Sequence, residues 1–174
     1  RDYVSRSLGC DALEDLEQLL AAKADALPTA APTHLHHDIP LTAEMGLKVL
    51  EWREQQLSLH LPLAPNVNHK STMFGGSLYC GAVLAGWGWL HLRLKEEGIT
   101  DGHIVIQEGQ ISYPLPVTGD AVAICPAPDA AVWKRFVAMY RRYGRARLTL
   151  DTRILNGGSE DEAVRFTGQY VLHS

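Results

Sequence analysis

A chain of 174 residues, 46% hydrophobic and 21% charged, has the composition of a globular domain and excludes a disordered or collagen-like protein. At this length one domain can bury a core without disulfides or metals. The formal net charge of −4 argues against a nucleic-acid partner, because no global basic field surrounds the chain. The three cysteines are widely spaced and no apolar signal segment opens the chain, so we expect a cytoplasmic protein.

The first part of the chain predicts one helix and a connector. Asp11 and the glutamate three residues later have the spacing of a capping box, and leucines at helical spacing follow over residues 11–26. Residues 28–40 are rich in proline and histidine and break both periodicities, which is typical of a connector. We therefore divide the chain into an N-terminal helix and connector, residues 1–37, and a main domain, residues 38–174.

Three histidines in this connector resemble a metal-ligand cluster: His34, His36 and His37. Neither a cysteine nor a carboxylate at matching spacing accompanies them, and zinc and related metals need such a complete ligand set. We therefore expect no metal site in this chain, and no other motif in the sequence calls for a cofactor.

Residues 46–61 alternate hydrophobic and polar side chains and run into Pro62 and Pro65. This pattern predicts one long strand, with a bulge near Glu54–Gln56. A helix is the alternative, because glutamate, glutamine and leucine are good helix formers.

The next segment, residues 71–92, has 22 residues without a formal charge, which is the length of a membrane span. Five glycines and several polar side chains lie within it, and they lower both its helix propensity and its affinity for lipid. A helix enclosed on nearly all sides also lacks charge all round. We therefore expect a central buried helix and no membrane span.

The rest of the chain predicts four strands and one more helix. Alternation and turn residues place these elements at residues 103–113, 117–125, 129–143 (the helix), 145–155 and 163–172. Asp129 is the expected N-cap of the helix and Gly144 its stop, and Asn156-Gly157-Gly158 is the expected turn of the last hairpin. One apolar helix followed by sequential strands implies an α+β fold, with that helix packed on a curved antiparallel sheet.

A polar loop, residues 66–77, enters the central helix through Gly75 and Gly76. The first turn of a helix exposes unpaired N–H groups and positive dipole potential, and glycines let a carbonyl or an anion approach this backbone. Such a terminus can act as an oxyanion hole. The alternative is structural: the glycines allow close helix–sheet packing and Asn68 turns the loop.

The sequence N-H-K-S-T-M-F-G-G, from Asn68 to Gly76, resembles the N-x-x-G-x-x-H-G-G signature of hot-dog-fold acyl thioesterases. The segments ISYPLPVTGDAVAIC and RARLTLDTRILNGGSEDEAVRFTGQYVL resemble later parts of that fold. The chain is most similar to the thioesterase family named for the C-terminal domain of bacterial YiiD, over roughly residues 38–172. The resemblance implies a hot-dog fold, a homodimer with active sites at the subunit boundary, and acyl thioesters of coenzyme A or acyl carrier protein as substrates.

This resemblance also implies roles for particular residues. Asn68 matches the asparagine that positions the thioester or the attacking water, and Gly75 and Gly76 match the backbone donors at the helix start. Thr72 and Ser77 are polar groups that could help to activate water. His69 is a candidate general base or substrate contact, because its reference pKa is near neutrality, with an exposed loop histidine as the alternative.

Two departures from the family pattern bear on the mechanism. Phe74 stands where the superfamily has histidine, and Val83 stands where a common branch carries a catalytic carboxylate. A carboxylate from outside the central helix would have to take the place of the missing catalytic one. The candidates by strand position are Glu108, Asp120 and Asp151.

Other side chains are assigned to substrate binding. Met73 and Phe74 are expected to line the acyl chain, whereas Cys80 is expected to be a buried small hydrophobe. Arg145 and Arg147 belong to a basic cluster that suits recognition of coenzyme A phosphates, with a solvated face as the alternative. The further members of that cluster are Lys134, Arg135, Arg141 and Arg142.

The missing helix carboxylate leaves a second function open. A module of the same fold could bind acyl-CoA or acyl carrier protein without hydrolysing it. A dehydratase of this fold is the third possibility, but it needs a histidine–carboxylate pair near the helix, which the sequence does not show.

Overall fold

The computed structural model describes residues 35–174. The predicted helix over residues 11–26 and His34 lie outside the described residues. The described elements are α2 (Leu35–Asp38), α3 (Leu41–Glu44), β1 (Lys48–Arg53), β2 (Gln56–Leu61), a 3₁₀ turn (Ala64–Asn66), α4 (Gly75–Glu97), β3 (His103–Ser112), β4 (Ala121–Cys125), α5 (Ala130–Tyr143), β5 (Arg145–Asn156) and β6 (Glu162–His173).

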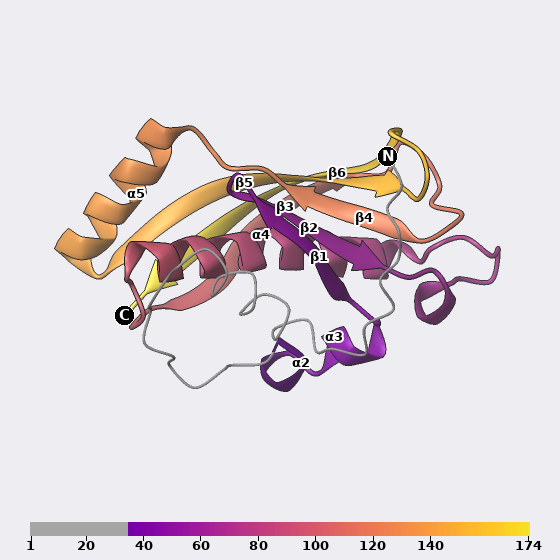
Figure 1. Cartoon of the computed structure of the whole chain (residues 1–174), viewed down its shortest axis with the longest axis horizontal. Helices are drawn as coiled ribbons and strands as arrows, with labels where there is room; N and C mark the ends of the chain where they lie inside the picture. Colours follow the sequence, from indigo (N-terminus) through magenta and orange to yellow (C-terminus); the bar gives the residue numbers. More distant parts are fainter. Residues whose placement is uncertain (1–34) are drawn as a thin grey trace.

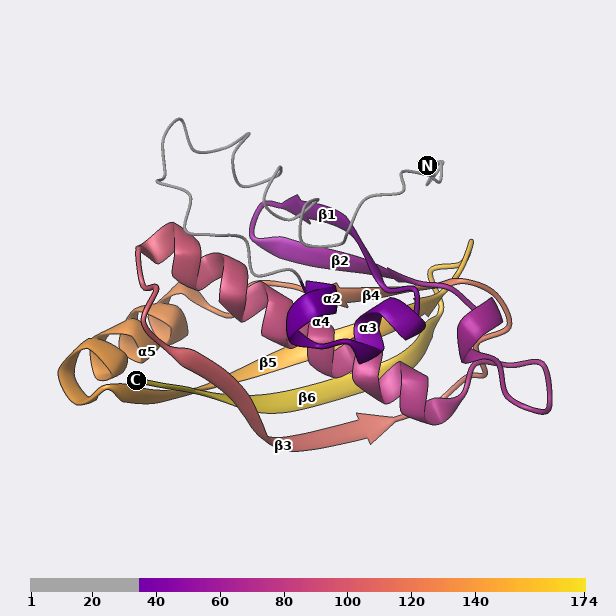
Figure 2. The same cartoon turned by 90° about the horizontal axis from the view of Figure 1, so that it is seen from below.

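The six strands form one antiparallel sheet in the order β1-β2-β4-β5-β6-β3. The sheet curves around α4, which lies across its concave side and contacts β2, β3, β4, β5 and β6 (Figures 1 and 2). The predicted α+β architecture, a long central helix on a curved antiparallel sheet, is confirmed.

Helix α4 is buried along most of its length. Side chains on several faces of the helix are almost inaccessible, among them Ala82, Ala85, Trp89 and Leu92. Enclosure on all sides explains the absence of charge, since a charge would lose its hydration wherever it pointed. Among residues 35–174 no helix is both long and apolar enough to cross a bilayer.

The internal strand β5 follows the predicted alternation. In β5 the side chains from Ala146 to Ile154 are alternately buried and exposed.

The helix ends are less uniform. Gly98 and Gly144 end α4 and α5 with backbone in the left-handed region. Asp129 occupies the N-cap position of α5, but its side chain makes no capping hydrogen bond. Strand β4 begins at Ala121, four residues later than predicted.

The prediction of one long strand over residues 46–61 was wrong. The chain instead forms a hairpin, β1 and β2, joined by the two residues Glu54 and Gln55, which both have positive φ (51° and 57°). This is the backbone of a type I′ turn, which normally selects asparagine and glycine. A tertiary contact holds the turn here, because the Trp89 indole N–H donates to the Gln55 carbonyl at 2.7 Å.

The connector prediction over residues 28–40 also needs a correction at its end. Residues Leu35–Asp38 form the single helical turn α2, and α3 follows it directly. The His36 ring lies 3.2 Å from the Leu47 carbonyl oxygen, which ties α2 to the start of β1. Proline and histidine composition does not reveal this turn, since the contact that supports it comes from eleven residues further along the chain.

Candidate functional site

The loop that enters α4 is anchored by Asn66, a residue to which the sequence assigned no role. Its side chain is buried, and its amide donates to the carbonyl oxygens of Met45 and Pro62, both at 2.8 Å. The Phe74 N–H donates to the Asn66 carbonyl at 2.7 Å. These bonds fix the position from which α4 begins.

Asn68 shapes the loop from within. Its side-chain oxygen accepts the backbone N–H groups of Lys70 at 2.8 Å and Thr72 at 3.2 Å. Its amide donates to the Thr72 hydroxyl at 2.9 Å, and Ser71 adopts a left-handed φ of 62° between them. The oxygen of Asn68 is thus engaged, and one amide hydrogen has no hydrogen-bond partner within the described part of the chain.

The first turn of α4 is open at its backbone. Within residues 35–174 no side chain caps the terminus. Two exposed aromatic rings flank it instead. The Phe74 ring lies over Gly76, where a Cβ would overlap it, and the Tyr113 ring would stand 3.6 Å from a Cβ on Gly75.

Tyr113 follows β3 and is a residue that the sequence analysis missed. Its hydroxyl donates to the Gly75 carbonyl at 3.0 Å, so it reaches the helix start from 38 residues away. Burial, with smaller contributions from Tyr79 and Cys80, raises the pKa of Tyr113, so that its hydroxyl stays a neutral donor. No local pattern in the sequence points to this contact.

The other predicted residues of this region have different environments. Met73 is packed in the core and its N–H donates to the Val117 carbonyl at 2.8 Å. Thr72 and Ser77 are half-buried, whereas His69 is exposed. Burial raises the pKa of the half-buried Cys80 thiol, which keeps it protonated and a poor nucleophile.

The candidate carboxylates are engaged elsewhere or exposed. Asp120 contacts His60 at 3.3 Å and accepts the Leu63 N–H at 2.9 Å. Glu108 is exposed beside a bulge in the edge strand β3. Asp151 accepts the Thr167 hydroxyl at 2.7 Å.

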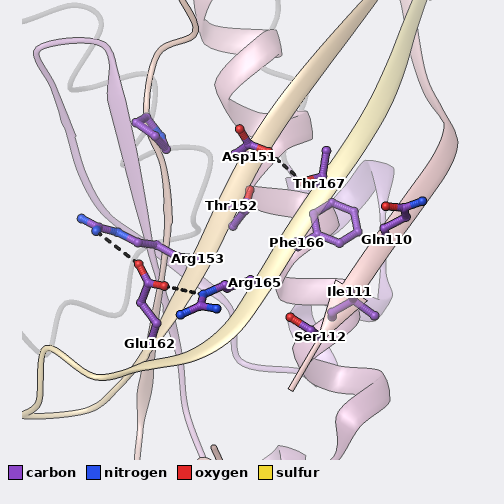
Figure 3. A pocket seen from close by; sticks show the side chains of 11 residues that line it. Gln110, Ile111, Ser112, Asp151, Thr152, Arg153, Glu162, Arg165, Phe166 and Thr167 are labelled. Atoms are coloured by element: carbon purple, nitrogen blue, oxygen red, sulfur yellow. Dashed lines mark hydrogen bonds and ion pairs between the residues drawn. The ribbon is translucent and has the colours of Figure 1, made fainter. Parts of the chain in front are cut away.

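Asp151 lines a hollow of about 650 Å³ over β3, β5 and β6 (Figure 3). It alternates along β5 with buried residues that face α4, so it points to the other side of the sheet. Arg153 and Arg165 meet Glu162 there, at 3.7 Å and 2.8 Å. The pKa of Glu162 is lowered, mainly by the hydrogen bond that Arg165 donates to its carboxylate. The charges of this hollow largely compensate one another.

Arg145 and Arg147 do not join the loop site within one chain. They begin β5 beside α5, which packs on the far end of α4: the Trp133 ring contacts the Trp89 ring with centroids 5.4 Å apart. Gly75 and Gly76 stand at the opposite end of this helix, which is about 34 Å long (Figure 1).

No group of three histidine, cysteine, aspartate or glutamate side chains that could hold a metal ion occurs among residues 35–174.

Several solved structures have a fold similar to that of this chain. A protein of unknown function from Chlorobaculum tepidum is 32% identical, with 94% of this chain and 98% of that chain covered and a TM-score of 0.78. A structure described as a putative thioesterase from Shewanella oneidensis is 31% identical, with 80% and 92% covered and a TM-score of 0.72. A mutant thioesterase from Pseudomonas aeruginosa is 13% identical, with 91% and 94% covered and a TM-score of 0.60, and supports the fold alone.

The predicted hot-dog fold is confirmed by these likenesses. The family model described as "Putative thioesterase (yiiD_Cterm)" matches residues 30–174. With a match over most of its length, this chain belongs to the YiiD C-terminal thioesterase family.

Proposed function

We propose that this chain hydrolyses acyl thioesters of coenzyme A or acyl carrier protein at the start of α4. The observation that carries the proposal is the open first turn of that helix, with Gly75 and Gly76 between two exposed rings. A thioester carbonyl oxygen placed there would meet backbone N–H groups and the positive end of the helix dipole. These groups stabilise the negative charge that develops on this oxygen when water attacks.

In the proposed reaction a water oxygen bonds to the thioester carbon, the carbon–sulfur bond breaks, and the proton released by the water passes to the departing thiolate. The remaining amide hydrogen of Asn68 orients the water, and the hydroxyls of Thr72 and Ser77 complete a polar rim. His69 is exposed on the same loop, where it can take up the proton. The exposed Phe74 ring gives the acyl chain an apolar surface beside the reacting carbonyl.

We also propose a homodimer through the edge strand β3. On one side β3 pairs with β6, and no described strand covers its other side. Val105 and Ile106 are 47% and 37% exposed on this strand, whereas the opposite edge, β1, is short and carries several charged side chains. A long unpaired edge with exposed apolar side chains is a template for pairing with a second copy.

The double variant Val105→Lys/Ile106→Lys is expected to be monomeric, because two ammonium groups would meet their symmetry mates at the edge. Sedimentation equilibrium measures the change, with Lys48→Glu on the β1 edge as the matched control that stays dimeric. A wild-type chain that sediments as a monomer would refute this interface.

Replacing Asn68 with alanine is expected to lower kcat for acyl-CoA hydrolysis by about tenfold or more, in line with the loss of one oriented donor in other enzymes. Asn68→Asp is the matched variant: its oxygen can still accept the N–H groups of Lys70 and Thr72, but the amide donor is lost. A thiol-release assay over a series of acyl chain lengths measures turnover, and thermal unfolding checks the fold. Full turnover in a folded Asn68→Asp protein would remove Asn68 from the mechanism.

A non-catalytic acyl-binding module is the second candidate function. It is favoured by Val83, which leaves the middle of α4 without a carboxylate. Saturable binding of acyl-CoA without release of thiol at any chain length would select this function over hydrolysis.

A further inference from the structure

A groove of about 760 Å³ runs between α5 and the first half of β5. The two elements lie side by side at one end of the molecule (Figures 1 and 2). The groove is lined by side chains from both elements, among them Val132, Phe136, Met139, Arg135, Arg145 and Arg147. Its volume falls in the range of pockets that bind small molecules.

One wall of the groove is an open strand edge. Strand β4 pairs only with the second half of β5, as far as Arg153, whereas residues 145–152 pair with β6 alone. The five consecutive residues from Arg145 to Thr149 line the groove. Because alternate residues of a strand direct their N–H and C=O groups to opposite sides, this wall presents backbone donors and acceptors to a ligand.

The groove also carries uncompensated positive charge. Residues 130–150 contain six lysines and arginines and no acidic residue. Two of the arginines have other contacts: Arg141 lies 3.8 Å from Glu97, and Arg142 lies over the Tyr143 ring at 5.1 Å. The three that line the groove have no carboxylate within 4 Å among the described residues. A guanidinium group that has no carboxylate partner is suited to bind phosphate, which it holds with two hydrogen bonds.

Apolar surface lies between these charges. Met139 is 48% exposed and Tyr143 is 62% exposed, although both belong to an amphipathic helix that buries Trp133, Phe136, Val137 and Tyr140. Flat aromatic ligands stack on such side chains and on guanidinium planes. The groove thus combines a polar backbone edge, an apolar face and free guanidinium groups.

We propose that the groove between α5 and β5 binds a phosphorylated nucleoside. The base lies against Met139 and Tyr143 and hydrogen-bonds to the open edge of β5, and the phosphates pair with Arg135, Arg145 and Arg147. This chemistry occurs both in the nucleotide end of coenzyme A and in free nucleotides. The site lies at the far end of α4 from Gly75 and Gly76, and its binding does not require hydrolysis to occur.

Isothermal titration calorimetry of the full chain tests the proposal with four probes: coenzyme A, adenosine 3′,5′-bisphosphate, ATP and inorganic phosphate. We expect saturable binding of at least one nucleotide probe and at least tenfold weaker binding of inorganic phosphate. Coenzyme A and the bisphosphate as the tightest ligands would identify the coenzyme as the source, and ATP as the tightest would identify a free nucleotide. Either result supports the site.

The double variant Arg145→Gln/Arg147→Gln is expected to weaken nucleotide binding by about tenfold or more, and Arg135→Gln to weaken it further. Arg153→Gln is the matched control, because it lies on the same strand but pairs with Glu162 outside the groove, and it should bind as the wild type does. Absence of saturable nucleotide binding would overturn the proposal. It would also be overturned if all variants bound alike, or if a polyglutamate peptide competed as well as the nucleotide.

Discussion

Replacing Gly86 with alanine is expected to lower the free energy of unfolding by about 2 kcal/mol, although alanine is the better helix former. A Cβ at this position of α4 would overlap the phenol of Tyr170, with the ring carbon Cζ only 2.5 Å away. Tyr170 cannot retreat easily, because it is fully buried and its hydroxyl donates to the Val83 carbonyl at 2.7 Å. Overpacking and the disturbed hydrogen bond therefore outweigh the gain of about 1 kcal/mol in helix propensity.

Urea unfolding monitored by circular dichroism measures this loss. Gly119→Ala is the control, since nothing lies within 4 Å of its Cβ position and stability should change little. In a Tyr170→Phe background the penalty of Gly86→Ala should shrink, because the hydroxyl nearest to the new methyl is gone. A Gly86→Ala protein as stable as the wild type would mean that the helix and the sheet are less closely packed than described.

Below neutral pH the protein is expected to lose up to about 3 kcal/mol of stability through His91 alone. The ring is stacked on Trp87 with centroids 5.1 Å apart, and its Nε2 is buried without a hydrogen-bond partner among the described residues. Burial, and then the charge of Lys95, lower the pKa of His91 from 6.5 to about 4, against a small opposing effect of Asp38. The unfolded chain therefore binds a proton that the folded chain excludes, so stability falls as the pH drops from about 6.5 to about 4.

The direct measurement is titration of the His91 ring by NMR, with a midpoint near pH 4 as the expected result. In unfolding experiments His91→Phe keeps a ring beside Trp87 and should depend less on pH than the wild type does in this window. His103→Gln, on an exposed position of β3, should leave the dependence unchanged. A normal midpoint near 6.5 for His91 would contradict the burial of its ring.

Parts of the fold could be predicted because their causes are local or periodic. The alternation of β5 and the glycine that ends α5, Gly144, depend on residues close in sequence, and these predictions are confirmed. The hairpin between β1 and β2 could not be predicted, because its turn residues, Glu54 and Gln55, carry no turn preference and are held by Trp89 from 34 residues away.

The candidate site divides in the same way. The Asn68–Thr72 contacts and the glycine pair lie within nine residues of each other, so the loop could be identified as a unit. Tyr113 could not, since only the docking of the end of β3 on the start of α4 brings it to Gly75. Asp151 has the strand position of a candidate base, but its place in the alternation directs it to the other face of the sheet.

Charge patterning and side-chain periodicity are properties of the chain itself, so they alone predict a buried helix within the uncharged segment 71–92, a glycine pair at its start and antiparallel strands after it. In the structure this helix begins at Gly75 and continues to Glu97. What these elements enclose follows from how they pack against one another. This packing separates Arg145 and Arg147 from the glycine pair by the length of α4. It also leaves one edge of β5 without a partner strand over residues 145–152, because β4 is too short to cover that edge. Such contacts join residues far apart in sequence, and only the packed chain brings them together.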